Sequence, residues 1–375
     1  MKTGYYVFFG DGDYHPSLLK TNEWISLWKL NEWKSFIDEL LSLEINTLMI
    51  YFNGNKLPYK SEIYPELNDT LHPNYQKEFL KDLLVYTKSK GLELIAVIST
   101  TGHAGRFSEL NKDSMIEVSS FNTSIEQTLV SFPEHLRKNK LSRKEGAAQI
   151  GYGVLCHNKE SSRKYAINII SEIIYLYGSY FDAIALHPPE SAYPCNCQEC
   201  ETKFYSQTNK SLTSSVEMGR QFFIKSYLEF QKEILFPIIK KSLPTCKQMT
   251  FTIPWLFERS FNVIAPFISK ETVIIEWDYN LDLKRIESLK SRLNEYMSLG
   301  HKVWFMPTAG FSFSNEQSID EQIHLVQKQL KIAEDAGTEG IVHFLGPRRS
   351  KFLVETSMKS LAVSNLEVQD YRSKL

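Results

Sequence analysis

The sequence predicts a (β/α)8 barrel, the TIM-barrel fold, built from the 375 residues of the chain. Eight short apolar runs alternate with long amphipathic segments. The runs are apolar at nearly every position, as parallel strands buried on both faces are. The alternative is an open doubly wound sheet, but no Gly-x-Gly-x-x-Gly stands at any strand-to-helix turn. We therefore predict a single catalytic-type barrel domain over residues 1–375.

Each element is predicted from its own residue pattern. The predicted strands are Tyr5–Gly10, Thr47–Phe52, Leu92–Ser99, Phe181–His187, Met249–Trp255, Val273–Tyr279, Lys302–Pro307 and Gly340–Gly346. The predicted helices are Leu30–Leu43, Gln76–Lys90, Arg163–Tyr177, Glu217–Leu243, Leu283–Leu299, Ile319–Ala336 and Lys351–Ser364. Gly91, Gly300 and Gly337 stand where helix-capping glycines belong. The stretch Thr100–Lys159 is too long for a plain loop and predicts an insertion after strand three, with a candidate short strand at Val154–His157.

Composition excludes several classes of protein. Lys and Arg number 43 and Asp and Glu 44, a net charge of −1 that gives no reason to expect nucleic acid or an anionic membrane as partner. No run approaches the ~18 apolar residues of a membrane helix. The short run Met1–Gly10 enters Asp11-Gly12-Asp13 without a small-residue cleavage site, so we expect a cytoplasmic protein. Five cysteines do not make a disulfide framework.

Three of the cysteines, Cys195, Cys197 and Cys200, fall within six residues, and Cys156 lies upstream. Four thiolates are a complete ligand set for a structural Zn²⁺. The alternative is a set of free buried thiols. A redox role is disfavoured, because thioredoxin-type Cys-x-x-Cys motifs open a helix directly after a strand. Cys246 stands alone and is expected to pack.

Catalytic residues of this fold lie at the carboxyl ends of the strands. The residues there include carboxylates, aromatic rings, imidazoles and amides, a set that suits a sugar, although any exposed barrel rim is polar. The predicted catalytic residues are Glu190, Asp278 and Glu276. The predicted substrate-binding residues are Asp11, Asn53, His103, Arg106, His187, Trp255 and Tyr279.

The stretch from Val154 to Cys200 resembles the zinc-containing microbial β-galactosidases. Those enzymes have a Cys-x-Asn segment, a helix, a strand that leads to the acid/base Glu, and then Cys-x-Cys-x-x-Cys. The resemblance implies that Cys156, Cys195, Cys197 and Cys200 bind zinc and that Glu190 is the general acid/base. Pro189 replaces the Asn that precedes this Glu in the family. Strand seven ends in Thr308-Ala309-Gly310, where the family has its nucleophilic Glu.

A second, weaker resemblance is to the β-N-acetylhexosaminidase barrels. Tyr64-Pro65-Glu66-Leu67 is similar to their Tyr-Pro-Glu-Leu segment, and Ser99–Ala104 is similar to their Pro-Gly-His-Ala segment. Glu190 matches the Glu of their catalytic Asp-Glu pair, but Pro189 replaces the Asp. Substrate-assisted catalysis is therefore not implied for this chain.

Together these observations predict a glycoside hydrolase that cleaves an O-glycosidic bond of an oligosaccharide or glycoside. Glu190 would protonate the leaving oxygen, and Asp278 or Glu276 would be the second carboxylate, with Asp11 or Asp13 as further candidates. The rival hypothesis is a degenerate barrel that binds glycans without cleaving them, because strand seven ends without a carboxylate. Arg348 and Arg349 are either a site for an anionic sugar substituent or a solvated pair.

Overall fold

The computed structural model describes residues 2–8, 28–54, 56–70, 75, 79–117, 154–189, 195–252, 261–277, 283–307 and 319–344. Eight parallel strands pair in chain order, and β1 also pairs with β8, so the sheet closes into a barrel. The strands are β1 (Lys2–Phe8), β2 (Thr47–Tyr51), β3 (Glu93–Ser99), β4 (Ala183–His187), β5 (Lys247–Phe251), β6 (Val273–Trp277), β7 (Val303–Met306) and β8 (Gly340–Phe344). The predicted barrel fold is confirmed.

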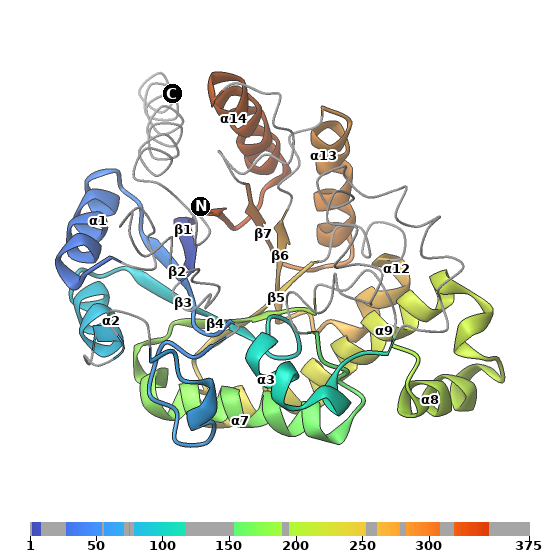
Figure 1. Ribbon diagram of the computed structural model, residues 1–375. Helices are drawn as coiled ribbons and strands as arrows, with labels where there is room; N and C mark the ends of the chain where they lie inside the picture. The colour runs from blue at the N-terminus through green and yellow to red at the C-terminus, as the bar shows by residue number, and fades with distance from the viewer. Residues whose placement is uncertain are drawn as a thin grey trace.

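Helices surround the strands (Figure 1). They are α1 (Leu30–Ser42), α2 (Phe79–Ser89), α3 (Gly105–Leu110), α7 (Glu160–Tyr177), α8 (Gln198–Thr208), α9 (Val216–Phe230), α10 (Phe236–Ser242), α12 (Phe261–Ile264), α13 (Leu283–Ser298) and α14 (Ile319–Ala336). Gly91, Gly300 and Gly337 have φ of 79°, 82° and 85°, the left-handed conformation that glycine adopts when it ends a helix. Among the described helices, none has the length and apolar character needed to cross a membrane.

The inward-facing side chains form layers of four, as the strand registers show. The four side chains of one layer come from the odd-numbered strands, and those of the next layer come from the even-numbered strands. One layer, near the amino ends of the strands, combines Gly4, Ile95, Met249 and Trp304. A layer near the carboxyl ends combines Tyr51, His187, Trp277 and Phe344. Between them the interior is filled by apolar side chains such as Val97, Ile275 and Val342. The barrel is therefore a packed core and not a channel.

The alternate residues of each strand face the helices. Tyr5, Val7, Leu48, Ile50, Leu94 and Ile274 pack against helix residues such as Trp33, Leu83 and Ile170 in a second core. Burial on both faces is the reason that the strands read as continuous apolar runs.

Several helical features differ from the prediction. The predicted helix Glu217–Leu243 is α9 and α10 joined by a π-helical turn over Gln231–Leu235, next to Pro237, which has no amide hydrogen for the helix. Helix α8 and the two short helices α3 and α12 were not predicted. Of the predicted insertion after strand three, residues 118–153 lie outside the described residues, as does the predicted helix Lys351–Ser364. The insertion and the single-domain assignment stay predictions.

Candidate active site and cysteine cluster

The carboxyl-end layer of the barrel is made of aromatic and imidazole rings. The His187 ring lies 5.5 Å from the Tyr51 ring, 5.2 Å from Phe251 and 6.1 Å from Trp277, measured between centroids. The indole N–H of Trp277 donates to the carbonyl of Thr252, at the end of β5. These rings, each less than 7% exposed, form a packed floor beneath the mouth at which barrel enzymes carry out their chemistry.

His103 joins this floor from the loop after β3. Its backbone is left-handed, with φ of 48°, and its ring lies 5.1 Å from His187 and 5.7 Å from Tyr51. Gly102 makes this position accessible, since a Cβ atom there would lie 2.8 Å from the carbonyl oxygen of Pro188. The structure thus brings together two of the predicted substrate-binding residues, His103 and His187.

Asn53 is buried after the end of β2 and hydrogen-bonded to β3. Its side-chain amide donates to the Ser99 carbonyl at 2.7 Å, and its amide oxygen accepts from the Ser99 amide at 2.8 Å. The residue is buried and both ends of its amide bond β3. Asn53 therefore holds the end of β3 in place, and direct contact of Asn53 with substrate stays a prediction.

Glu276 is held in a buried ion pair on the helix-facing side of the barrel. On β6 it shares the helix-facing side with Ile274, while Val273, Ile275 and Trp277 face the barrel interior. Its carboxylate is fully buried and lies 3.0 Å from Nε of Arg292. It also accepts hydrogen bonds from Tyr296 at 2.9 Å and Thr252 at 2.8 Å. A carboxylate held by these groups is directed toward the helices and away from the mouth, so the geometry favours a structural role for Glu276 over the predicted catalytic one.

The remaining predicted site residues fall into two groups. Arg106 is on the surface of α3 and pairs with Glu109 at 2.9 Å. Glu190, Asp278, Asp11, Asp13, Trp255 and Tyr279 lie outside the described residues, as do Arg348 and Arg349. Sequence reasoning did not select Tyr51, Phe251 and Phe344 for the site. The two-residue alternation along each strand was the available signal, because it places them on one face with Tyr6, Met249 and Val342.

The four predicted cysteine ligands converge. The sulfur atoms of Cys156, Cys195, Cys197 and Cys200 all lie within 4.8 Å of one another and are buried. The Cys156 sulfur is 3.4 Å from that of Cys200 and 3.7 Å from that of Cys197, too far for a disulfide, whose bond is ~2.05 Å. Four sulfurs at ~2.3 Å around a tetrahedral Zn²⁺ would stand ~3.8 Å apart. The donor set and its spacing fit that ion.

Polar groups around the cluster donate hydrogen bonds to two of its sulfur atoms. The amide of Glu117 donates to the Cys195 sulfur at 3.3 Å, and the side chain of Asn158 donates to Cys200 at 3.2 Å. Hydrogen bonds from the neighbouring thiols, that of Cys156 first, lower the pKa of Cys195, and hydrogen bonds from Cys156 and Cys200 lower that of Cys197 to about 6. The pKa of Cys156 is raised instead, by its hydrogen bond with Cys195 first. Cys197 also stands at the amino end of α8, where negative charge is stabilised.

Helix α9 links the cysteine cluster to the ring floor. His157, next to Cys156, bonds Ser226 at 2.6 Å between Nε2 and Oγ. The following residue, Tyr227, donates its hydroxyl to the His187 carbonyl at 3.0 Å, and this hydroxyl is 3.2 Å from that of Thr100. Burial raises the pKa of Tyr227 to about 12, so the hydroxyl keeps its proton. The end of β4 is therefore held from the cysteine-cluster side.

The loop after β2 is held by a single buried carboxylate. Glu172 of α7 accepts from the Ser61 hydroxyl at 2.7 Å, from the Tyr59 hydroxyl at 3.3 Å, and from the amides of Glu62 and Ile63 at 2.9 and 3.3 Å. This loop carries the Tyr64–Leu67 segment, which forms a short 3₁₀ turn at Pro65–Leu67. Glu172 thus fixes the loop against α7.

We expect Glu172→Ala to lower the free energy of unfolding by about 3 kcal/mol, because four donors lose their acceptor and part of them stay buried. Urea unfolding measures the change, and limited proteolysis should show earlier cleavage in residues 59–70. Glu160→Ala, at an exposed position on the same helix, is the matched control and should cost less than about 1 kcal/mol. Equal effects of the two substitutions would contradict the assigned role.

Comparison with known proteins gives a likeness of fold. No family model and no curated protein matches the chain. Among solved structures, a β-galactosidase from the Antarctic haloarchaeon Halorubrum lacusprofundi superposes with a TM-score of 0.63 at 9% identity, over 98% of this chain and 58% of that one. A β-galactosidase from the psychrophilic Marinomonas ef1 gives 0.61 at 10% identity, over 100% and 60%. A pneumococcal exo-β-D-N-acetylglucosaminidase module, StrH, gives 0.54 at 11% identity, over 97% and 83%.

The architecture is a closed (β/α)8 barrel, similar in fold to the barrels of these glycoside hydrolases. The predicted resemblance to β-galactosidase and hexosaminidase barrels is confirmed at the level of fold. At about 10% identity the likeness extends to the fold alone. The chain spans about three-fifths of the length of the two β-galactosidases that it matches.

Proposed function

We propose that this chain is a glycoside hydrolase that cleaves an O-glycosidic bond at the carboxyl-end mouth of the barrel. The observation that carries the proposal is the floor of Tyr51, His103, His187 and Trp277 at that mouth. Aromatic faces stack on the apolar side of a sugar ring, and imidazoles hydrogen-bond its hydroxyls. Carbohydrate is thus the ligand class that this floor suits. The barrel's likeness to glycoside hydrolases supports the same assignment.

The proposed general acid is Glu190, the third residue after β4. It would protonate the leaving oxygen, which requires a carboxyl group that stays protonated near neutral pH. Asp278, directly after β6, is the proposed second carboxylate, since Glu276 is directed toward the helices by its contacts with Arg292 and Tyr296. A separation of ~5–5.5 Å between the two carboxyl groups would give retention, and ~6.5–9.5 Å would give inversion.

The test is hydrolysis of a panel of aryl glycosides and unactivated oligosaccharides by the full chain and by Glu190→Gln. On an unactivated substrate the variant should lose about 10²–10⁴-fold in kcat/KM, because it cannot protonate the leaving oxygen. On a nitrophenyl glycoside, whose leaving group needs little protonation, the loss should be much smaller. Glu109→Gln, at an exposed rim position, is the control and should keep full activity. Equal losses on both substrate types would count against Glu190 as the acid.

A second candidate is a barrel that binds glycans without cleaving them. The observation that favours it is Glu276, because one of three predicted catalytic carboxylates is engaged in a buried ion pair. This candidate predicts saturable binding of an oligosaccharide with no hydrolysis of any glycoside in the panel. It also predicts that Glu190→Gln leaves the affinity for that oligosaccharide nearly unchanged.

We further propose that Cys156, Cys195, Cys197 and Cys200 hold a structural zinc ion. The convergence of four buried sulfurs within 4.8 Å supports this proposal. With four thiolates as ligands, the ion would have no open position for water or substrate, so its role would be to stabilise the fold. The cluster would fasten the segment after Glu190 to α8 and, through His157 and Ser226, to α9.

A further inference from the structure

The amino-end mouth of the barrel carries a ring of charged side chains. Lys2 of β1, Glu93 of β3 and Lys247 of β5 belong to one inward-facing layer. The Glu93 carboxylate accepts from Nζ of Lys247 at 2.8 Å and lies 3.1 Å from Nζ of Lys2. Glu93 is buried, while both lysine side chains are about half exposed. Two ammonium groups thus converge on one carboxylate and are held in position by it.

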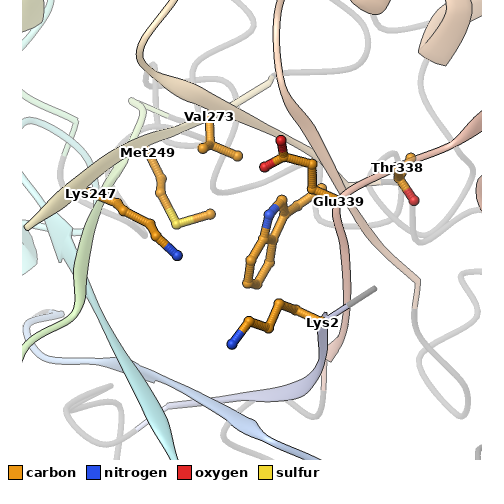
Figure 2. Close-up of a pocket in the computed structure, with 7 residues that line it drawn as sticks. Lys2, Lys247, Met249, Val273, Thr338 and Glu339 are labelled. Carbon is orange, nitrogen blue, oxygen red and sulfur yellow. The ribbon is translucent and has the colours of Figure 1, made fainter.

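A hollow of about 420 Å³ lies beside this ring. Figure 2 shows the ammonium ends of Lys2 and Lys247 directed into it, with Met249 and Val273 along its wall. Val273 belongs to the even-strand layer next to the lysines, whose other members are the small residues Thr47, Ala183 and Gly340. Gly340 also leaves room for the indole of Trp304, which a Cβ atom at this position would overlap.

The charges around the hollow do not cancel. Lys2 and Lys247 face the single carboxylate of Glu93, which leaves one positive charge. Glu339, on the opposite wall, is balanced by Lys302 at 3.3 Å. Each ammonium has three N–H donors, so both lysines can bond a second anion while still bonding Glu93. The wall between them is apolar, formed by Met249, Val273 and Trp304.

We propose that this mouth binds a small organic monocarboxylate whose apolar body rests on Met249, Val273 and Trp304 and whose carboxylate lies between Lys2 and Lys247. The hollow falls within the ~300–1,000 Å³ range of small-molecule sites. A charged head and an apolar body match the two halves of its lining. The site is separated from the proposed sugar site by the packed layers of the barrel interior, so the two ligands bind independently.

The test uses benzoate as the probe and benzamide, its neutral analogue of the same shape, as the matched control ligand. Isothermal titration and saturation-transfer NMR on the full chain should show one saturable benzoate site per chain and no binding of benzamide. Lys247→Met removes one ammonium and should weaken benzoate binding at least about tenfold. Val273→Phe fills the hollow without changing charge and should abolish binding. Lys88→Met, which removes a lysine paired with Asp182 outside the hollow, should leave the affinity unchanged.

Several results would overturn the proposal. If Lys247→Met leaves the benzoate affinity unchanged, the carboxylate binds somewhere else. If benzamide binds as tightly as benzoate, the negative charge of the ligand does not contribute to binding. Binding of inorganic phosphate as tight as that of benzoate would remove the role of the apolar wall. If Lys247→Met does not fold, as thermal unfolding will show, the half-exposed Lys2→Met tests the same charge. Glycosidase activity should not respond to benzoate, so failure of this site and failure of the hydrolase assignment are distinguishable.

Discussion

Replacing Cys200 with Ser is expected to release bound zinc and to lower the free energy of unfolding by about 4 kcal/mol or more. The four sulfurs are buried, and the Cys156 sulfur lies 3.7 Å from that of Cys197 and 3.4 Å from that of Cys200. Without the cation, thiolates at this spacing repel one another, and thiols lose the bonds that hold α8 against residues 154–158. Chelation of the parent protein should have the same effect.

The measurements are the metal content of the purified protein and its unfolding in urea with and without a chelator. Cys246→Ser is the matched control, because Cys246 is also buried but lies at the start of β5, with its sulfur 3.7 Å from the Lys247 carbonyl. It should keep about one zinc per chain and respond to the chelator as the parent does. If the parent protein contains no metal after expression in zinc-containing medium, the cluster is a set of free thiols.

The second large effect is expected at the ion pair of Glu276 and Arg292. Glu276→Ala should lower the free energy of unfolding by about 3–5 kcal/mol, because it leaves the Arg292 guanidinium buried without its carboxylate. Tyr296 and Thr252 lose their acceptor at the same time. Asp335→Asn, which removes an exposed pair with Lys331 on α14, should cost less than about 0.5 kcal/mol.

The double variant Glu276→Leu with Arg292→Leu separates the buried charge from the packing. It should be more stable than Glu276→Ala alone, since no ion is left without a partner. Urea unfolding of the single and double variants checks this order. The reverse order, or a single-variant loss below about 1 kcal/mol, would contradict the structural role given to the pair.

The sequence predicted all eight strands because each is buried on both faces and reads as a continuous apolar run. The same property hid the direction of the side chains. On β6, Ile274 faces the helices and Ile275 faces the barrel interior, so both faces of the strand are apolar. The sequence therefore could not show whether the side chain of Glu276 points toward the interior or toward the helices. Strand β5 begins at Lys247, two residues before the predicted start, because a lysine at the barrel mouth looks like a loop residue.

The convergence of the four cysteines could be predicted from the sequence, because closely spaced cysteines in a protein without a disulfide framework are typical of a metal site. Helix α8, which carries Cys200, could not be predicted from its residue pattern. Its sequence is polar, and Cys200 and Phe204 are the buried residues along it, so it has no apolar stripe to reveal a helix. The contacts that position the ring floor, such as those of Asn53 and Tyr227, join residues distant in sequence and leave no local pattern.

Pairing of β1 with β8 joins the second residue of the chain to Gly340, so the cylinder closes only when the last strand has arrived. Contacts between residues so far apart form late in folding, after the local strand–helix units. Until then, one edge of β1 exposes unpaired backbone N–H and C=O groups beside apolar side chains. A strand of another molecule can pair with this edge and start aggregation. The native sheet has no such edge. Refolding should therefore be limited by aggregation at high protein concentration, although the finished barrel offers no strand to which a neighbour could add.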